Sequence, residues 1–77
     1  MDPLIGEIKY FAGNFAPQGW AFCQGQIYSI AQNQALFSIL GTTYGGDGRT
    51  TFGLPKIDDL NGCKAIIAIQ GVYPPRS

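Results

Sequence analysis

Short apolar runs separated by glycine-rich turns dominate the chain and predict small β-strands. Residues 4–12 (LIGEIKYFA) mix β-branched, aromatic and charged side chains, which predicts a strand with one wetter face. Two further β-favouring runs cover residues 20–23 and 27–30. The segment between them, Gln24-Gly25-Gln26, supplies a glycine for the positive φ of a tight turn. We therefore predict a β-hairpin over residues 20–30.

One segment has the periodicity of a helix. Asn33 suits its N-cap and Gly41 suits the position just after its end. The apolar stripe between them consists of Leu36, Phe37, Ile39 and Leu40. A helix of about two turns is marginal alone in water, so it must pack its apolar side on the strands.

A glycine-rich loop follows over residues 41–55. It lacks the Gly-Lys-Ser/Thr ending of a phosphate-binding P-loop, which argues against a nucleotide site. We expect Asp47 to form a local Asx-type turn and Arg49 to pair with it or with a carbonyl. Phe52 and Leu54 are expected to enter the core.

The last third of the chain holds a polar turn and a strongly apolar run. Adjacent Asp58 and Asp59 fit a solvated turn better than a calcium loop or an acid–base pair, because neighbours in an extended chain point apart. The run KAIIAIQGV is apolar on both faces, as in a strand that is buried centrally or covered by another subunit. We expect residues 64–73 to close the fold and residues 74–77 to form an extended, proline-containing tail.

Together these elements predict one small α+β domain over residues 1–77 that is mostly β. It should combine short antiparallel strands and hairpins with one short helix and a long glycine-rich loop. A chain this short buries only about 60% of its unfolded surface, so a disulfide, a metal or a partner subunit is expected to support it.

Composition favours the partner subunit. Charged residues make up 13% of the chain, against roughly 25% in ordinary domains, and hydrophobic residues reach 45%. The formal net charge is zero, which also favours association. We expect the end of the chain to contact other copies, through Ile67, Ile69, Val72, Tyr73, Pro74 and Pro75.

The cysteines leave three arrangements open. Cys23 and Cys63 are the only two, there is no His, and no paired spacing fits zinc, so neither a metal nor another cofactor is expected. An internal disulfide would close a loop of roughly forty residues and add about 3–4 kcal/mol. Two free buried thiols and an intermolecular bridge are the alternatives.

Several partners and compartments are not expected. The basic residues are scattered singly, whereas phosphate binding needs clusters, so nucleic acid is excluded. No run approaches the roughly eighteen apolar residues that span a bilayer, which argues against membrane insertion. The first residues lack the basic and apolar regions of a classical signal peptide, leaving lysis or a dedicated machine as export routes.

No catalytic arrangement can be written from these residues, because no placed nucleophile, base or metal set is present, so the chain is not expected to be an enzyme. Trp20 is expected to anchor the core, with a stacking surface for a sugar or a partner as the alternative. In that alternative a glycan-binding surface would use Trp20, Tyr44, Asp47 and Arg49.

The motifs resemble the phage tail collar domain, a family that includes bacterial proteins called microcystin-dependent proteins. The resemblance spans about residues 4–55 without a gap. It is carried by Ile5-Gly6-Glu7-Ile8, Phe11-Ala12-Gly13-Asn14-Phe15-Ala16-Pro17, Gly19-Trp20, Cys23-Gln24-Gly25-Gln26, Asn33-Gln34-Ala35-Leu36-Phe37-Ser38, Leu40-Gly41-Thr42-Thr43-Tyr44-Gly45-Gly46-Asp47-Gly48 and Thr51-Phe52 with Leu54-Pro55. The final segment from Ile66 onward also looks like the end of microcystin-dependent proteins.

One departure from the family pattern follows Leu54-Pro55. Members usually continue with Asp-Leu-Arg-Gly-Arg and a long Gly- and His-rich region, whereas this chain runs through Lys56-Ile57-Asp58-Asp59 almost at once into its last strand. The chain therefore looks like a minimal collar domain without the long insert.

The resemblance implies a small, oligomeric collar fold. Together with the low charge, the apolar last strand and the missing insert, it predicts a homo-oligomeric or filamentous structural subunit of an extracellular or phage-tail-like appendage, located outside the cell or on a virion. The alternative is an adhesive or receptor-binding module of a tail fibre, with a cell-surface glycan as its partner. In phage relatives, regions beyond the collar carry receptor recognition, so that role is not transferred to this chain.

Overall fold

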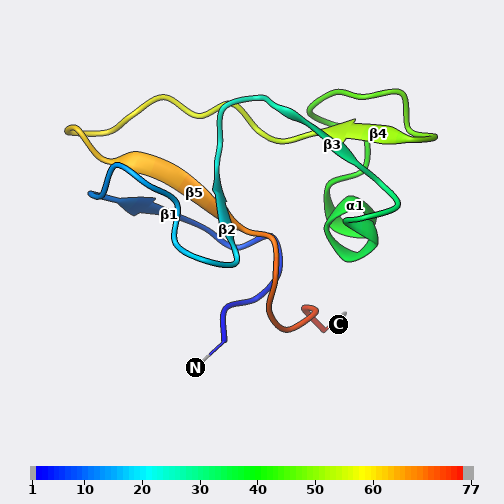
Figure 1. The fold of residues 1–77 in the computed structure, drawn as a ribbon, viewed down its shortest axis with the longest axis horizontal. Helices are drawn as coiled ribbons and strands as arrows, with labels where there is room; N and C mark the ends of the chain where they lie inside the picture. Colours follow the sequence, from blue (N-terminus) through cyan, green and yellow to red (C-terminus); the bar gives the residue numbers. More distant parts are fainter. Residues whose placement is uncertain (1, 76–77) are drawn as a thin grey trace.

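The computed structural model describes residues 2–75 and contains two small antiparallel sheets and one short helix (Figure 1). The elements are β1 (Ile8–Phe11), β2 (Trp20–Phe22), β3 (Ile27–Ser29), α1 (Gln34–Leu40), β4 (Thr51–Gly53) and β5 (Lys64–Ala68). One sheet has the order β1-β5-β2, and the other pairs β3 with β4. The predicted α+β class with mostly β structure is confirmed.

β5 is the central strand of the larger sheet, which explains why its sequence is apolar on both faces. Ile66 and Ile67 are both 0% exposed although their side chains point to opposite faces. β1 and β2 are each antiparallel to β5, so the connection over residues 12–19 must cross β5 to join them. The strand ends at Ala68, earlier than the predicted residue 73. Beyond it, Val72 forms a single parallel bridge with Leu4.

The predicted hairpin over residues 20–30 is wrong, because its two strands belong to different sheets. β2 pairs with β5, and β3 pairs with β4. Gly25, at φ 77°, does turn the chain, but its N–H donates to the carbonyl of Pro55 at 3.3 Å. The Gln26 amide also donates to the carbonyl of Phe22 at 2.7 Å. The first bond ties the turn to the segment after β4, and in the second a side chain occupies a carbonyl of β2 that a hairpin partner strand would use.

The first predicted strand is shorter than expected. β1 covers residues 8–11, and Gly6, at φ 88°, interrupts the extended backbone before it. The Gly6 N–H donates to the carbonyl of Ala68, while the Ala68 N–H donates to the carbonyl of Glu7, both at 2.9 Å. Gly6 and Glu7 therefore both lie opposite Ala68, as in a β-bulge.

The helix lies where it was predicted, but Asn33 does not cap it with its side chain. The Asn33 side-chain amide instead donates to the carbonyl of Ser29 at 3.0 Å. Gly41 adopts φ 58°, and its N–H donates to the carbonyl of Phe37 at 2.7 Å. Leu36 is the buried residue of this helix, at 1% exposed. Packing of Leu36, rather than an N-terminal side-chain cap, therefore holds α1 in place.

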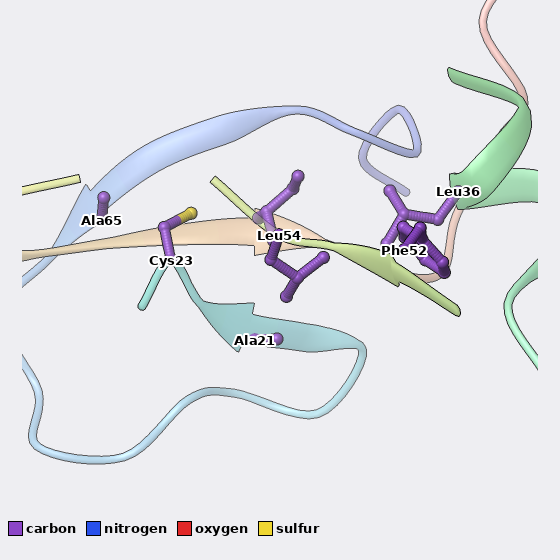
Figure 2. Close-up of a cluster of buried hydrophobic side chains, with 7 residues drawn as sticks. Ala21, Cys23, Leu36, Phe52, Leu54 and Ala65 are labelled. Atoms are coloured by element: carbon purple, nitrogen blue, oxygen red, sulfur yellow. The ribbon is translucent and has the colours of Figure 1, made fainter. Parts of the chain in front are cut away.

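The core joins the two sheets and the helix. Its buried members are Ala21, Cys23, Leu36, Phe52, Leu54, Ala65 and Ile67. Figure 2 shows Leu54 between the small side chains of the larger sheet and the pair formed by Phe52 and Leu36. Phe52 and Leu54 are both 0% exposed, which confirms their predicted burial. Each such side chain contributes about 1.5–3 kcal/mol on burial.

Candidate functional site

The loop before β4 is organised by the carboxylate of Asp47. One carboxylate oxygen accepts the backbone N–H groups of Arg49 at 2.8 Å, Thr50 at 2.9 Å and Thr51 at 3.0 Å. The other accepts the Thr50 hydroxyl at 3.1 Å. These bonds, the backbone ones above all, hold the pKa of Asp47 well below its usual range. The predicted Asx-type turn is confirmed, and the carboxylate is committed to it.

Arg49 does not pair as predicted. Its backbone N–H reaches Asp47, but within residues 2–75 the guanidinium forms neither an ion pair nor a hydrogen bond. The ion pair found in this part of the chain joins Lys64 to Asp59, with 3.3 Å between Nζ and Oδ2. Asp59 is therefore held in a surface contact, in keeping with a solvated turn.

The glycine-rich loop folds tightly onto β4. The Gly53 N–H donates to the carbonyl of Gly45 at 2.9 Å, and the Gly48 N–H donates to that of Thr51 at 3.0 Å. Gly46 has φ 87°, and a Cβ there would collide with the backbone of Phe52. These glycines therefore bring backbone against backbone, which is a structural role.

Trp20 lies between two hollows of the surface rather than in the core cluster, so its predicted role as a core anchor is wrong. It is half-buried, and the Lys9 ammonium nitrogen lies 4.5 Å from the centre of one of its rings, a cation–π contact. One hollow, of about 320 Å³, is lined by Asp2, Pro3, Gln18, Gly19, Trp20, Gln70 and Gly71. The other, of about 270 Å³, is lined by Asp2, Pro3, Glu7, Lys9 and Trp20.

The four residues predicted as one ligand surface do not lie around one hollow. Trp20 belongs to the larger sheet, whereas Tyr44, Asp47 and Arg49 belong to the loop before β4 (Figure 1). None of these three lines either hollow beside Trp20. Sequence reasoning missed Gln70, which lies there because its N–H donates to the carbonyl of Gly19 at 3.3 Å. No local sequence motif predicts this contact between Gln70 and Gly19, because the two residues are far apart in the sequence.

The predicted subunit contacts fall into two groups. Ile67 is 0% exposed in the core of its own chain, so its assignment as a contact is wrong. Ile69 is half-buried against that core. The others continue beyond the larger sheet: Val72 and Tyr73 are 51% and 46% exposed, Pro74 is half-buried and Pro75 is exposed.

The end of the described chain lies against α1. The hydroxyls of Tyr73 and Ser38 form a hydrogen bond of 2.6 Å. A hollow of about 210 Å³ is lined by Ser38, Ile39, Tyr73, Pro74 and Pro75. Residues 76 and 77 of the predicted extended tail lie outside the described residues.

Both cysteines are free thiols in the structure. Cys23 is 3% exposed, and this burial raises the pKa of its thiol. Its backbone N–H donates to the carbonyl of Ala65, and Cys63 lies two residues before Ala65 and is half-buried. The two residues therefore lie on neighbouring strand ends without being bonded.

Between residues 2 and 75, no group of three or more His, Cys, Asp or Glu side chains is arranged to hold a metal ion. No helix in that range has the length and apolarity needed to cross a membrane.

Large apolar side chains are the most distinctive feature of the surface. Those that are 37–63% exposed are Leu4, Ile8, Tyr10, Phe15, Ile27, Ile39, Tyr44, Leu60, Val72 and Tyr73. Ile8 and Tyr10 share one face of β1, and Val72 and Tyr73 follow one another after β5. The surface thus offers apolar contacts on more than one element.

Comparison with known proteins assigns the family. The family model of the phage tail collar domain matches residues 6–61, more than half of the chain. A search of curated proteins found no match. The phage tail collar domain is a structural tail-fibre domain, which implies a virion tail component. This chain therefore belongs to the phage tail collar domain family.

Proposed function

We propose that this chain is a non-enzymatic, self-assembling structural subunit of a phage-tail-like or extracellular appendage. The observation that carries the proposal is the set of ten large apolar side chains exposed on a chain with a formal net charge of zero. Large exposed apolar side chains gain from being covered by a second copy, and the absence of net charge removes long-range repulsion between copies.

The distribution of these side chains bears on the form of the assembly. Because they occur on β1, on β3, on α1 and after β5, different patches are available for different neighbours. Contacts between unlike patches extend into a filament unless the rotation closes a ring.

Light scattering coupled to size exclusion, repeated over a wide range of protein concentrations, tests this proposal. We expect an average mass above that of the 8.3 kDa chain, rising with concentration. Negative-stain microscopy of the same samples distinguishes closed rings from filaments. A monomer that persists at the highest concentration would contradict the proposal.

A second candidate function, binding of a cell-surface glycan, is favoured by the surroundings of Trp20. Two hollows meet at its indole, and Gln18, Gln70, Asp2 and Glu7 contribute polar groups to them. Aromatic rings stack on sugars, while amides and carboxylates bind their hydroxyls.

The chain has a single Trp, so its fluorescence reports directly on this region. Titration with soluble saccharides should shift or quench the emission, and Gln70→Ala should weaken the response. Tyr44→Ala, remote from both hollows, is the matched control. Unchanged emission with every saccharide, together with a blank glycan array, would remove this candidate.

A further inference from the structure

β1 forms one edge of the larger sheet, and its hydrogen-bonding pattern shows which backbone groups face outward. The Ala68 N–H donates to the carbonyl of Glu7 at 2.9 Å, so the backbone of Glu7 is directed toward β5. Bonding alternates along an antiparallel pair, so Lys9 and Phe11 also face β5. The N–H and C=O groups of Ile8 and Tyr10 therefore point away from the sheet.

The opposite edge of the same sheet is closed by its own chain. In β2 the outward groups belong to Trp20 and Phe22, because Cys23 bonds inward to Ala65. The Trp20 N–H donates to the carbonyl of Pro17 at 3.0 Å. The Phe22 carbonyl accepts the Gln26 amide at 2.7 Å. β2 is thus poorly suited to pair with another strand.

The smaller sheet is also protected. The glycine-rich loop bonds to β4 through the Gly53 N–H and the Thr51 carbonyl. In β3 the carbonyl of Ser29 accepts the Asn33 amide at 3.0 Å. Among the described edges, β1 keeps the longest open run of backbone groups.

The charges of Glu7, just before β1, and of Lys9, within β1, select one antiparallel register for a second copy of the same strand. Glu7 and Lys9 lie on the same face, on either side of Ile8. If Ile8 lies opposite Ile8 of the second copy, each Glu7 lies opposite a Lys9 across the pair. Two favourable contacts form there when the Lys9 ammonium turns from Trp20, 4.5 Å away, and the Glu7 carboxylate turns from the Leu4 N–H, 3.1 Å away. A shift that centres the pair on Lys9 would place two ammonium groups together.

We propose that two copies of this chain associate through their β1 edges, antiparallel and centred on Ile8. This inference rests on the proposed self-assembly and names one of its interfaces. The two three-stranded sheets are then joined through the backbone groups of the two facing Ile8 residues, and Ile8, 41% exposed, gains a neighbour on one face. Tyr10 lies opposite Gly6 of the second copy, whose N–H already donates to the carbonyl of Ala68. Such a two-fold contact is closed, so it makes a dimer, and a longer assembly must use further surfaces.

Charge reversal tests the register. Lys9→Glu and Glu7→Lys should each weaken the dimer about tenfold, because attraction becomes repulsion in both contacts. Mixing the two variants should restore association, since all four facing positions then carry opposite charges. Analytical ultracentrifugation measures both effects, and circular dichroism checks that each variant is folded. If Lys9→Glu, Glu7→Lys and their mixture all associate equally, the β1 interface is contradicted.

A cross-link tests the same interface independently. Facing residues in a hydrogen-bonded antiparallel pair have Cα atoms about 5.5 Å apart, within the range that a disulfide spans. Ile8→Cys in a Cys63→Ser background should therefore form a covalent dimer under mild oxidation. Gln32→Cys, an exposed position away from β1, is the matched control and should not.

The outcomes separate this inference from the proposed function. If the unmodified protein associates but neither the charge reversals nor the Ile8→Cys cross-link report β1, this interface is wrong and self-assembly stands. If the unmodified protein stays monomeric at every concentration, both are wrong.

Discussion

At the scale of single residues, the side chain of Asp47 holds the loop before β4 in a turn. Its carboxylate accepts three backbone N–H groups and one hydroxyl from the next few residues, although the side chain is exposed. These bonds favour the ionised form, so the pKa is lower in the folded than in the unfolded chain. The contribution to stability is complete above about pH 4, the ordinary range of Asp, and is lost as the pH falls toward the folded-state pKa.

We therefore expect Asp47→Asn to lower Tm by several degrees at neutral pH, with the difference from the native chain shrinking by about pH 2. Thermal melts monitored by circular dichroism over this range measure it. Asp58→Asn, which removes an exposed carboxylate that has no hydrogen bond within residues 2–75, is the control and should change Tm little. A gap for Asp47→Asn that stays constant with pH would contradict the assignment.

Alanine substitutions at Gly46 and Gly62 distinguish the cost of a strained backbone conformation from the cost of a steric collision. Both have positive φ, 87° and 82°, but a Cβ at Gly46 meets the backbone of Phe52, whereas a Cβ at Gly62 has no atom within 4 Å. Gly62→Ala should cost about 1–2 kcal/mol from conformation alone. Gly46→Ala should cost clearly more, because backbone atoms must move. Chemical denaturation measures both, and equal losses would show that the loop does not need the close approach.

At the scale of elements, β4 connects the parts of the fold. Phe52 contacts Phe37 of α1, with 5.5 Å between ring centres, and Tyr28 of β3, with 6.4 Å. Just beyond β4, Leu54 enters the cluster shared with the larger sheet. Loss of this one strand would separate the helix and both sheets.

We expect Phe52→Ala to cost about 3–5 kcal/mol. A chain of this size has a total stability of only about 4–12 kcal/mol, so this variant should be largely unfolded or melt far earlier. Ile27→Ala, on the neighbouring strand but 55% exposed, is the matched control and should remain within about 1 kcal/mol of the native chain. A cooperative melt of Phe52→Ala near the native Tm would contradict the central role of β4.

The elements that the sequence predicted well are those determined locally. The helix follows from its own apolar spacing and Gly41, and the buried strand follows from a run that is apolar on both faces. The hairpin over residues 20–30 failed because strand pairing is decided by distant partners. Short β-favouring runs such as β2 and β3 can pair with many strands. In this fold β2 pairs with β5, and β3 pairs with β4.

The same distinction holds for the site residues. The Asp47 turn was predictable because all its partners lie within four residues. The hollows at Trp20 were not, because they bring together the start of the chain, the segment before β2 and the segment after β5. Composition also did not show that Ile67 packs in the core of its own chain instead of contacting another copy.

At the scale of the whole molecule, the two thiols report on folding. Cys63 is half-buried, whereas Cys23 is 3% exposed and has a raised pKa. A thiol reagent should therefore modify one cysteine readily in the native protein and the second only when the chain unfolds. Mass spectrometry of native and denatured samples counts the modified residues. No reactive thiol in denaturant would demonstrate a disulfide instead.

The bond between the Val72 N–H and the Pro3 carbonyl, at 2.9 Å, places two segments from opposite ends of the described chain side by side. In Figure 1 both ends leave the fold from the same side. Circular permutation exploits this arrangement. A short flexible linker between residues 75 and 2, with new termini opened in the exposed turn at Asn61-Gly62, should leave both sheets intact. The opened turn would then be free to carry a fused peptide.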